Sequence, residues 1–136
     1  MGMRVRISRC VVDLIQRSAA DAAPLEACGL LFGTDAMIEA ASVEANVAAN
    51  PLVHFEIDPA GLFAAIRAER AGGPRVAGYW HSHPSGDAMP SITDAAMAVA
   101  DGKLWLIVTE DAVTAWRATP RGARHGRFDA VELDEG

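Results

Sequence analysis

The sequence predicts an α/β fold in which one mixed β-sheet is flanked by helices. Three observations support this prediction. Segments with helical and with strand-like periodicity are mixed along the chain, and 136 residues suit one domain with a single core. An apolar fraction of 51% against 22% charged residues is typical of a compact chain. We therefore expect a single domain that spans residues 1–136.

The first half of the chain is predicted to contain two helices and three strands. Apolar residues at helical spacing predict a helix from about Ser8 to Ala22, which Pro24 closes. Asp58 before Pro59 predicts the N-terminus of a second helix. The apolar face of this second helix is expected to consist of Leu62, Phe63 and Ile66. The predicted strands are residues 27–33, 36–47 and 54–58.

The second half is predicted to contain one helix and four strands. A strand over 75–80 leads into two histidines, and a helix begins at Ser91 and stops at Asp101. Two apolar strands are expected to flank a tight turn at residues 110–111. These two strands cover residues 103–109 and 112–118. The C-terminal residues 127–133 are predicted to add an edge strand.

Charge and cysteine content exclude several classes of function. A net charge of −6 disfavours binding to nucleic acid or to anionic membrane surfaces, which attract clustered Lys and Arg. No segment approaches the roughly 20 apolar residues that span a bilayer, and the N-terminus lacks a signal-peptide pattern. Cys10 and Cys28 are expected to be reduced. A cytoplasmic location follows.

Two histidines stand one residue apart after the predicted strand 75–80. If the strand continues through them, its alternation points His81 and His83 to one side and Trp80 to the other. Two imidazoles on one face are costly to bury without a shared partner, and Zn²⁺ is such a partner. Asp94, folded back by the proline-containing loop, would add an oxygen ligand. Three protein ligands leave one position for water, as in catalytic zinc sites.

Ser91 and Asp94 also have a simpler interpretation, because Ser-x-x-Asp before an apolar run fits a helix capping box. The complete pattern is more specific: His-x-His, seven residues, then Ser-x-x-Asp. Ordinary residue frequencies would produce it in roughly one chain of this length in ten thousand. The pattern therefore indicates a zinc site formed by His81, His83 and Asp94.

The segment His81-Ser82-His83, followed after seven residues by Ser91-Ile92-Thr93-Asp94, resembles the JAMM motif of the JAMM/MPN+ (JAB domain) zinc metallopeptidases. Residues 24–33 are similar to the segment that carries the family's upstream glutamate. Residues 50–59 and the helix after them look like the small stand-alone bacterial members. The resemblance covers about residues 10–118 and implies the MPN/JAB architecture, which is cytidine-deaminase-like.

The resemblance implies a role for each residue of the motif. His81, His83 and Asp94 would hold one catalytic Zn²⁺ per chain. Glu26 would be the general base toward zinc-activated water, and Ser91 would steady the oxyanion of the tetrahedral intermediate.

Three further residues could compete for these roles. Glu56 is a rival general base, although strand alternation would point it outward. His54 and His125 are expected to be a strand-surface residue and a loop residue rather than metal ligands.

The activity implied is that of a JAMM-type zinc metallopeptidase or isopeptidase. The expected substrate is a ubiquitin-like sulfur-carrier protein, or its C-terminal adduct, cleaved after Gly-Gly. An extended peptide could add to the sheet edge at the site, with glycine allowing close approach. The alternative is a catalytically inert MPN-type scaffold or binding module. A zinc deaminase would need Pro-Cys-x-x-Cys, which is absent from the sequence. A homodimer is compatible with the sequence.

Overall fold

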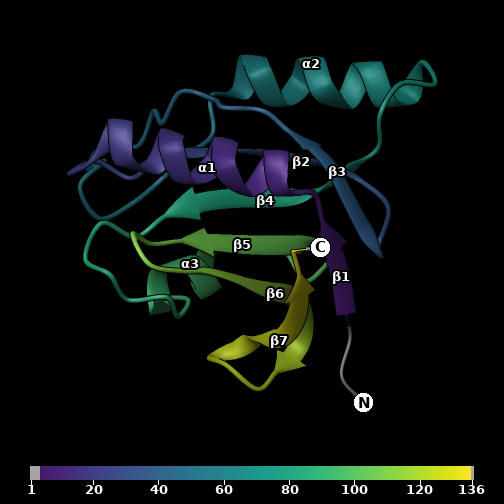
Figure 1. Ribbon diagram of the computed structural model, residues 1–136. Coiled ribbons are helices and arrows are strands. Elements are labelled where there is room, and N and C mark those ends of the chain that lie inside the picture. The colour runs from purple at the N-terminus through teal and green to yellow at the C-terminus, as the bar shows by residue number, and fades with distance from the viewer. Residues whose placement is uncertain (1–3, 136) are drawn as a thin grey trace.

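The computed structural model describes residues 4–135, which form three helices and seven strands (Figure 1). The helices are α1 (Arg9–Ala22), α2 (Pro59–Arg70) and α3 (Ile92–Met97). The strands are β1 (Arg4–Ile7), β2 (Cys28–Gly33), β3 (Met37–Ala41), β4 (Val76–Ser82), β5 (Leu104–Val108), β6 (Val113–Gly122) and β7 (Gly126–Asp134). No helix within the described residues is long and apolar enough to cross a membrane.

The strands form one mixed sheet that closes into a barrel in the order β1-β3-β2-β4-β5-β6-β7. β1 is parallel to both β3 and β7, and β4 is parallel to β5, whereas the other neighbours are antiparallel. The predicted α/β class with a mixed sheet is confirmed. The prediction that the C-terminal strand lies at an edge is wrong, because β1, a strand that the sequence analysis missed, pairs with β7.

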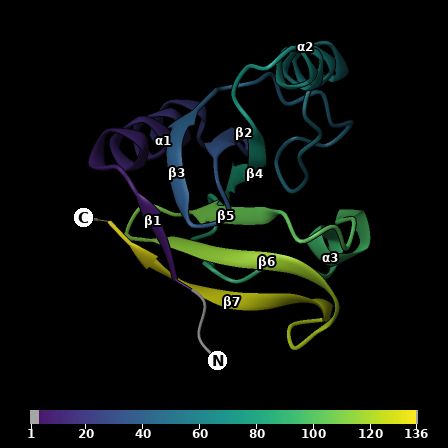
Figure 2. The same ribbon diagram turned by 90° about the vertical axis from the view of Figure 1, so that its right-hand side faces the viewer.

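Alternation along the central strands divides the core between the two faces of the sheet. On β5, Leu104, Leu106 and Val108 pack in the cluster that includes residues of α1. Trp105 and Ile107 point the other way, into the cluster that includes residues next to and within α3. Figure 2 shows these two helices on opposite sides of the central strands. Two-sided burial explains why β5 is apolar throughout its length.

The first helix forms as predicted, and the second forms with a different burial pattern. Ser8 caps α1 by accepting a hydrogen bond from the backbone N–H of Val11. Asp58 caps α2 in the same way, immediately before Pro59. However, no residue of α2 is fully buried, and Phe63 is 58% exposed. The predicted apolar face is confirmed for Leu62, which packs against the core, and Ile66 is half-buried, but it is wrong for Phe63, because α2 lies at the periphery of the sheet (Figure 1).

Residues 54–58 do not form the predicted strand. They contribute one isolated bridge, between Ile57 and Asn46. The Asn46 side chain organises this region instead: its Oδ1 accepts from the N–H groups of Ala48 and Glu56, and its Nδ2 donates to the carbonyl of His54. Two backbone hydrogen bonds, from the Val47 N–H to the Glu56 carbonyl and from the Asp58 N–H to the Ala45 carbonyl, join these side-chain contacts in place of a regular ladder.

The third helix is shorter than expected. It begins after Ser91 as predicted but ends at Met97, because Ala98 adopts an extended conformation. The fold nevertheless places the N-terminus of α3, the end of β4 and the start of β2 together.

Candidate metal centre

Pairing of β2 with β4 brings Glu26 to the histidine motif. Cys28 lies opposite His81 in the antiparallel register. The pairing extends one step beyond β2: the Ala27 N–H donates to Ser82 Oγ at 2.8 Å, and the Ser82 N–H donates to the Ala27 carbonyl at 2.9 Å. Glu26 is the next residue outward. The pairing of β2 with β4 therefore brings Glu26 close to the histidines, although the residues are far apart in the sequence.

The main chain of Glu26 is fixed on both sides. Its N–H donates to the carbonyl of Pro51, and its carbonyl accepts from Asn46 Nδ2, each at 2.8 Å. Segment 46–51 therefore acts as a second support for this residue. The side chain of Glu26 is buried, which is rare for a carboxylate without a partner.

β4 delivers the two histidines to one face, as its alternation predicts. His81 is fully buried and its ring stacks on Phe55, with centroids 4.2 Å apart and an interplanar angle of 19°. Trp80 points into the opposite core cluster. The N–H of His83 donates to the Val108 carbonyl at 2.9 Å, so the ladder with β5 extends past the end of β4. Both imidazoles are held by regular sheet structure.

Asp94 arrives from the first turn of α3. It forms a capping box with Ser91: Ser91 Oγ accepts from the Asp94 N–H, and Asp94 Oδ2 accepts from the Ser91 N–H, both at 2.9 Å. The predicted capping box is therefore confirmed. Asp94 is buried and faces the two histidines, so capping and site formation use the same carboxylate.

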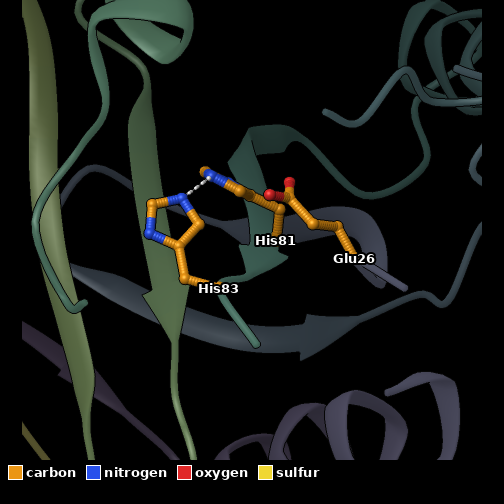
Figure 3. A group of neighbouring side chains, drawn as sticks. All are labelled: Glu26, His81 and His83. Carbon is orange, nitrogen blue, oxygen red and sulfur yellow. Dashed lines mark hydrogen bonds between the residues drawn. The ribbon is translucent and has the colours of Figure 1, made fainter. Parts of the chain in front are cut away.

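Four ligand-type atoms from three side chains converge at distances that suit a small tetrahedral ion. His81 Nε2 lies 3.0 Å from His83 Nε2 and 3.2 Å from Asp94 Oδ1, and His83 Nε2 lies 3.1 Å from Asp94 Oδ2. Ligands bound tetrahedrally at about 2.0–2.1 Å would be roughly 3.3 Å apart. Figure 3 shows the carboxylate of Glu26 beside the imidazoles, and these three side chains form a group that could hold a metal ion.

Hydrogen-bond chemistry also favours a cation among these atoms. His83 Nδ1 lies 2.7 Å from the Asp87 carbonyl, which can only accept, so Nδ1 carries a proton. In the neutral imidazole, Nε2 then presents a lone pair to the carboxylate of Asp94, which is also only an acceptor. A metal ion at Nε2 or a second proton on His83 removes this conflict, and a backbone carbonyl holding the other nitrogen is the usual arrangement at a ligating histidine.

The surroundings shift the pKa values of the two carboxylates, Glu26 and Asp94, in opposite directions. Burial raises the pKa of Glu26 to about 7, while His83 acts to lower it. Asp94 is buried too, but hydrogen bonds from His81 and His83 hold its pKa well below the usual range. Asp94 is thus a permanent anion. Glu26 is poised to exchange a proton near neutrality, and its buried Oε1 has no hydrogen-bond partner within residues 4–135.

Burial and Asp94 act in opposite directions on the histidines. Burial is the dominant effect on His81 and lowers its pKa despite the adjacent carboxylate. Burial also acts to lower the pKa of His83, but its hydrogen bonds to Asp94 and to the Asp87 carbonyl raise it overall. A neutral His81 retains a lone pair for a metal ion.

Comparison with known proteins identifies the family. The family model for prokaryotic homologs of the JAB domain matches residues 8–119. The chain belongs to this family. It is also 39% identical over 103 residues to desampylase of Haloferax volcanii, an alignment that covers 74% of each protein. The expected family is confirmed, and so is the expectation of a JAMM-type hydrolase.

Solved structures support the JAB-domain fold. A protein from Desulfitobacterium hafniense superposes with a TM-score of 0.77 at 25% identity, over 97% of this chain and 94% of that one. A structure described as a JAMM metalloprotease-like zinc site superposes with a TM-score of 0.56 at 23% identity, over 98% of this chain and all of that one. The second likeness concerns the fold alone.

The rival candidates are not part of the group formed by Glu26, His81 and His83. His54, which was expected on the surface of a strand, is half-buried and does not lie in a strand. Glu56 is exposed and lines a different groove, with Tyr79 and Trp105. His125 bonds the Pro90 carbonyl through Nε2 at 3.0 Å. The sequence analysis missed two contributors, Phe55 against His81 and the Asp87 carbonyl at His83. A backbone carbonyl carries no signal in the residue type, and Phe55 resembled an ordinary strand residue.

A groove opens beside the site of the JAB domain. Its lining includes Glu26, His83 and Ser91, with apolar walls that include Leu52 and Val53 from one side and Met89 from the other. Leu52 and Val53 are more than half exposed. Both edges of β4 are occupied, by β2 and β5, and the sheet is closed among the described residues. The expected addition of a peptide to a sheet edge here is therefore wrong; the groove is the accessible surface.

Proposed function

We propose that this JAB-domain protein is a zinc isopeptidase whose ion is held by His81, His83 and Asp94. The observation that carries the proposal is the convergence of two imidazole nitrogens and the carboxylate oxygens of Asp94 within 3.0–3.2 Å. The nitrogen and oxygen donors suit Zn²⁺, and three protein ligands leave a position open for chemistry. Glu26 stands beside these ligands, where it can act on the reacting groups.

The residues divide the hydrolysis between them. When bound, the zinc ion supplies a Lewis acid that activates water and polarises the scissile carbonyl. Glu26 accepts a proton as the water oxygen bonds to the carbonyl carbon. It returns this proton to the amine as the C–N bond breaks. Ser91 Oγ accepts from the Asp94 N–H, so its own hydroxyl proton is free to stabilise the developing oxyanion.

Zinc content provides the first test. Protein purified without added metal should contain about one zinc per chain, and His83→Ala should be largely metal-free because it removes one of three ligands. Elemental analysis measures both. His54→Ala is the matched control, because it removes an imidazole that is not part of the cluster, and it should keep its zinc. Equal zinc in the wild type and in the His81→Ala/His83→Ala double variant would contradict the ligand assignment.

For the substrate, we propose the C-terminal tail of a ubiquitin-like sulfur-carrier protein, cleaved after Gly-Gly. The motif resemblance to small bacterial members and the relationship to desampylase support this choice. The groove adds a physical reason. It leads past the apolar Leu52, Val53 and Met89 to the buried ligands, so an extended tail without Cβ atoms would reach the site most easily.

A mass-spectrometric assay tests the substrate. A sulfur carrier from the same genome, extended by one residue after Gly-Gly, should lose only that residue in a zinc-dependent reaction. The same carrier with Ala-Ala in place of Gly-Gly should be cleaved at least about 10-fold more slowly, because added Cβ atoms obstruct approach to the buried site. Cleavage of unrelated unfolded peptides with an untouched carrier would indicate a general peptidase instead. An inert scaffold would bind the carrier and cleave neither.

A further inference from the structure

The segment that precedes α3 is held by side chains at three of its carbonyl groups. His83 Nδ1 bonds the Asp87 carbonyl, as described for the candidate metal centre. Thr114 Oγ1 donates to the Ala88 carbonyl at 2.7 Å. His125 Nε2 bonds the Pro90 carbonyl at 3.0 Å. His83 is one of the proposed metal ligands. Thr114 and His125, in contrast, lie on the β6–β7 hairpin and have no role in the chemistry described so far.

The contact from Thr114 is part of a directed chain of hydrogen bonds. Trp116 Nε1, an obligate donor, lies 3.0 Å from Thr114 Oγ1. Thr114 therefore accepts from Trp116 and points its own proton at the Ala88 carbonyl. Trp116 is buried on β6, so the chain starts from a rigid part of the barrel. Such relays fix the orientation of a hydroxyl that would otherwise rotate freely.

The contact from His125 reaches across 35 residues from the turn of the same hairpin. The Pro90 carbonyl can only accept, so His125 Nε2 is the donor. The backbone of His125 has a φ of 54°, in the left-handed region that non-glycine residues seldom adopt. His125 as a whole is exposed, and this hydrogen bond ties its ring to the segment before α3.

Both contacts hold the backbone just before Ser91, which forms the capping box with Asp94. Pro90 directly precedes Ser91, whose N–H donates to Asp94 Oδ2, and this oxygen faces His83 Nε2. A displacement of the Pro90 carbonyl would therefore move the capping box and the carboxylate together. We infer that Thr114 and His125 are positioning residues that hold Asp94 and Ser91 in register with the histidines. This inference rests on the proposed zinc site.

The test measures zinc affinity by competition with a chromophoric chelator. Outer residues that orient ligands commonly change metal affinity or activity by about 10- to 100-fold. We expect a 3- to 10-fold loss of affinity for Thr114→Val or His125→Ala, and about 10- to 100-fold for the double variant. His125→Gln should recover most of the loss, because the glutamine amide can donate from nearly the position of Nε2. Alanine and glutamine face the same backbone strain, so their difference isolates the hydrogen bond.

Thr119→Val is the matched control for Thr114→Val. Both residues lie on β6 and both lose a donating hydroxyl, but Thr119 bonds Asp129 and does not reach the segment before α3. Its zinc affinity should equal that of the wild type. A merely structural role would lower the unfolding temperature of the metal-free protein and leave the zinc affinity of folded protein unchanged. That result, or no recovery in His125→Gln, would overturn the inference. A wild-type protein that binds no zinc would instead overturn the proposed function.

Discussion

Replacing Glu26 by glutamine should leave zinc content and fold intact while lowering the rate of hydrolysis by about 10²- to 10⁴-fold, the usual contribution of a general acid–base group. Glutamine preserves the shape and the burial of the side chain but cannot accept the proton. The pKa of about 7 that burial gives Glu26 lies where proton transfer at neutral pH is most effective. Steady-state kinetics on the extended carrier, together with elemental analysis of the same samples, measure both quantities.

The matched control is Glu56→Gln, which makes the same chemical change on an exposed carboxylate outside the cluster. It should retain the wild-type rate. A Glu26→Gln variant with a near wild-type rate, beside an inactive Glu56→Gln variant, would show that the other glutamate is the base. Loss of zinc from Glu26→Gln would instead make Glu26 a ligand, in line with its proximity to both histidines. The two measurements together therefore separate the base role from a ligand role.

The histidine half of the site is predictable from sequence because its geometry is local. Period-2 alternation is enough to place His81 and His83 on one face, away from Trp80, and the capping box fixes Asp94 in the first turn of a helix. Neither pattern requires knowledge of distant contacts. Only the path of the loop between the histidines and Asp94 had to be assumed, and its prolines favour a chain that folds back toward the histidines.

Glu26 could be placed only by resemblance to a known family, because nothing around it in the sequence identifies a site. Its position depends on the register of β2 against β4 and on hydrogen bonds from segment 46–51, which are contacts between distant parts of the chain. The same reason explains the missed barrel closure. β1 has only four residues, and its partner strand β7 lies at the other end of the chain. Strand pairing over such distances is not encoded in local periodicity.

The burial of α2 shows a different limit of sequence patterns. Its capping signals, Asp58 and Pro59, act within one turn and predict the N-terminus correctly. Which face is buried depends on where the helix docks, and α2 docks at the periphery with only Leu62 and Ala65 against the core. Apolar spacing predicts a helix but not the depth of its burial.

Substitutions of Ser91 can show whether its hydroxyl both caps α3 and stabilises the oxyanion. Ser91→Ala removes the acceptor for the Asp94 N–H and the proposed donor to the oxyanion, so we expect about 1 kcal/mol lower stability and about 10²- to 10³-fold lower kcat. Ser91→Gly costs only a few tenths of a kcal/mol at an N-cap yet lacks the same donor, so it should be nearly as stable as the wild type and as slow as Ser91→Ala.

Ser91→Thr completes the comparison, because threonine keeps both the acceptor and the donor and is an acceptable N-cap. It should retain most of the stability and most of the rate. Chemical denaturation of the metal-free variants measures the cap, and kcat of the zinc-loaded variants measures the donor. If the rate followed stability across alanine, glycine and threonine, Ser91 would act through the helix alone. If instead kcat is high only in the variants with a hydroxyl, while stability depends only on how well the residue caps the helix, Ser91 has two separate roles. Its oxygen lone pair accepts from the Asp94 N–H, and its proton is donated to the substrate.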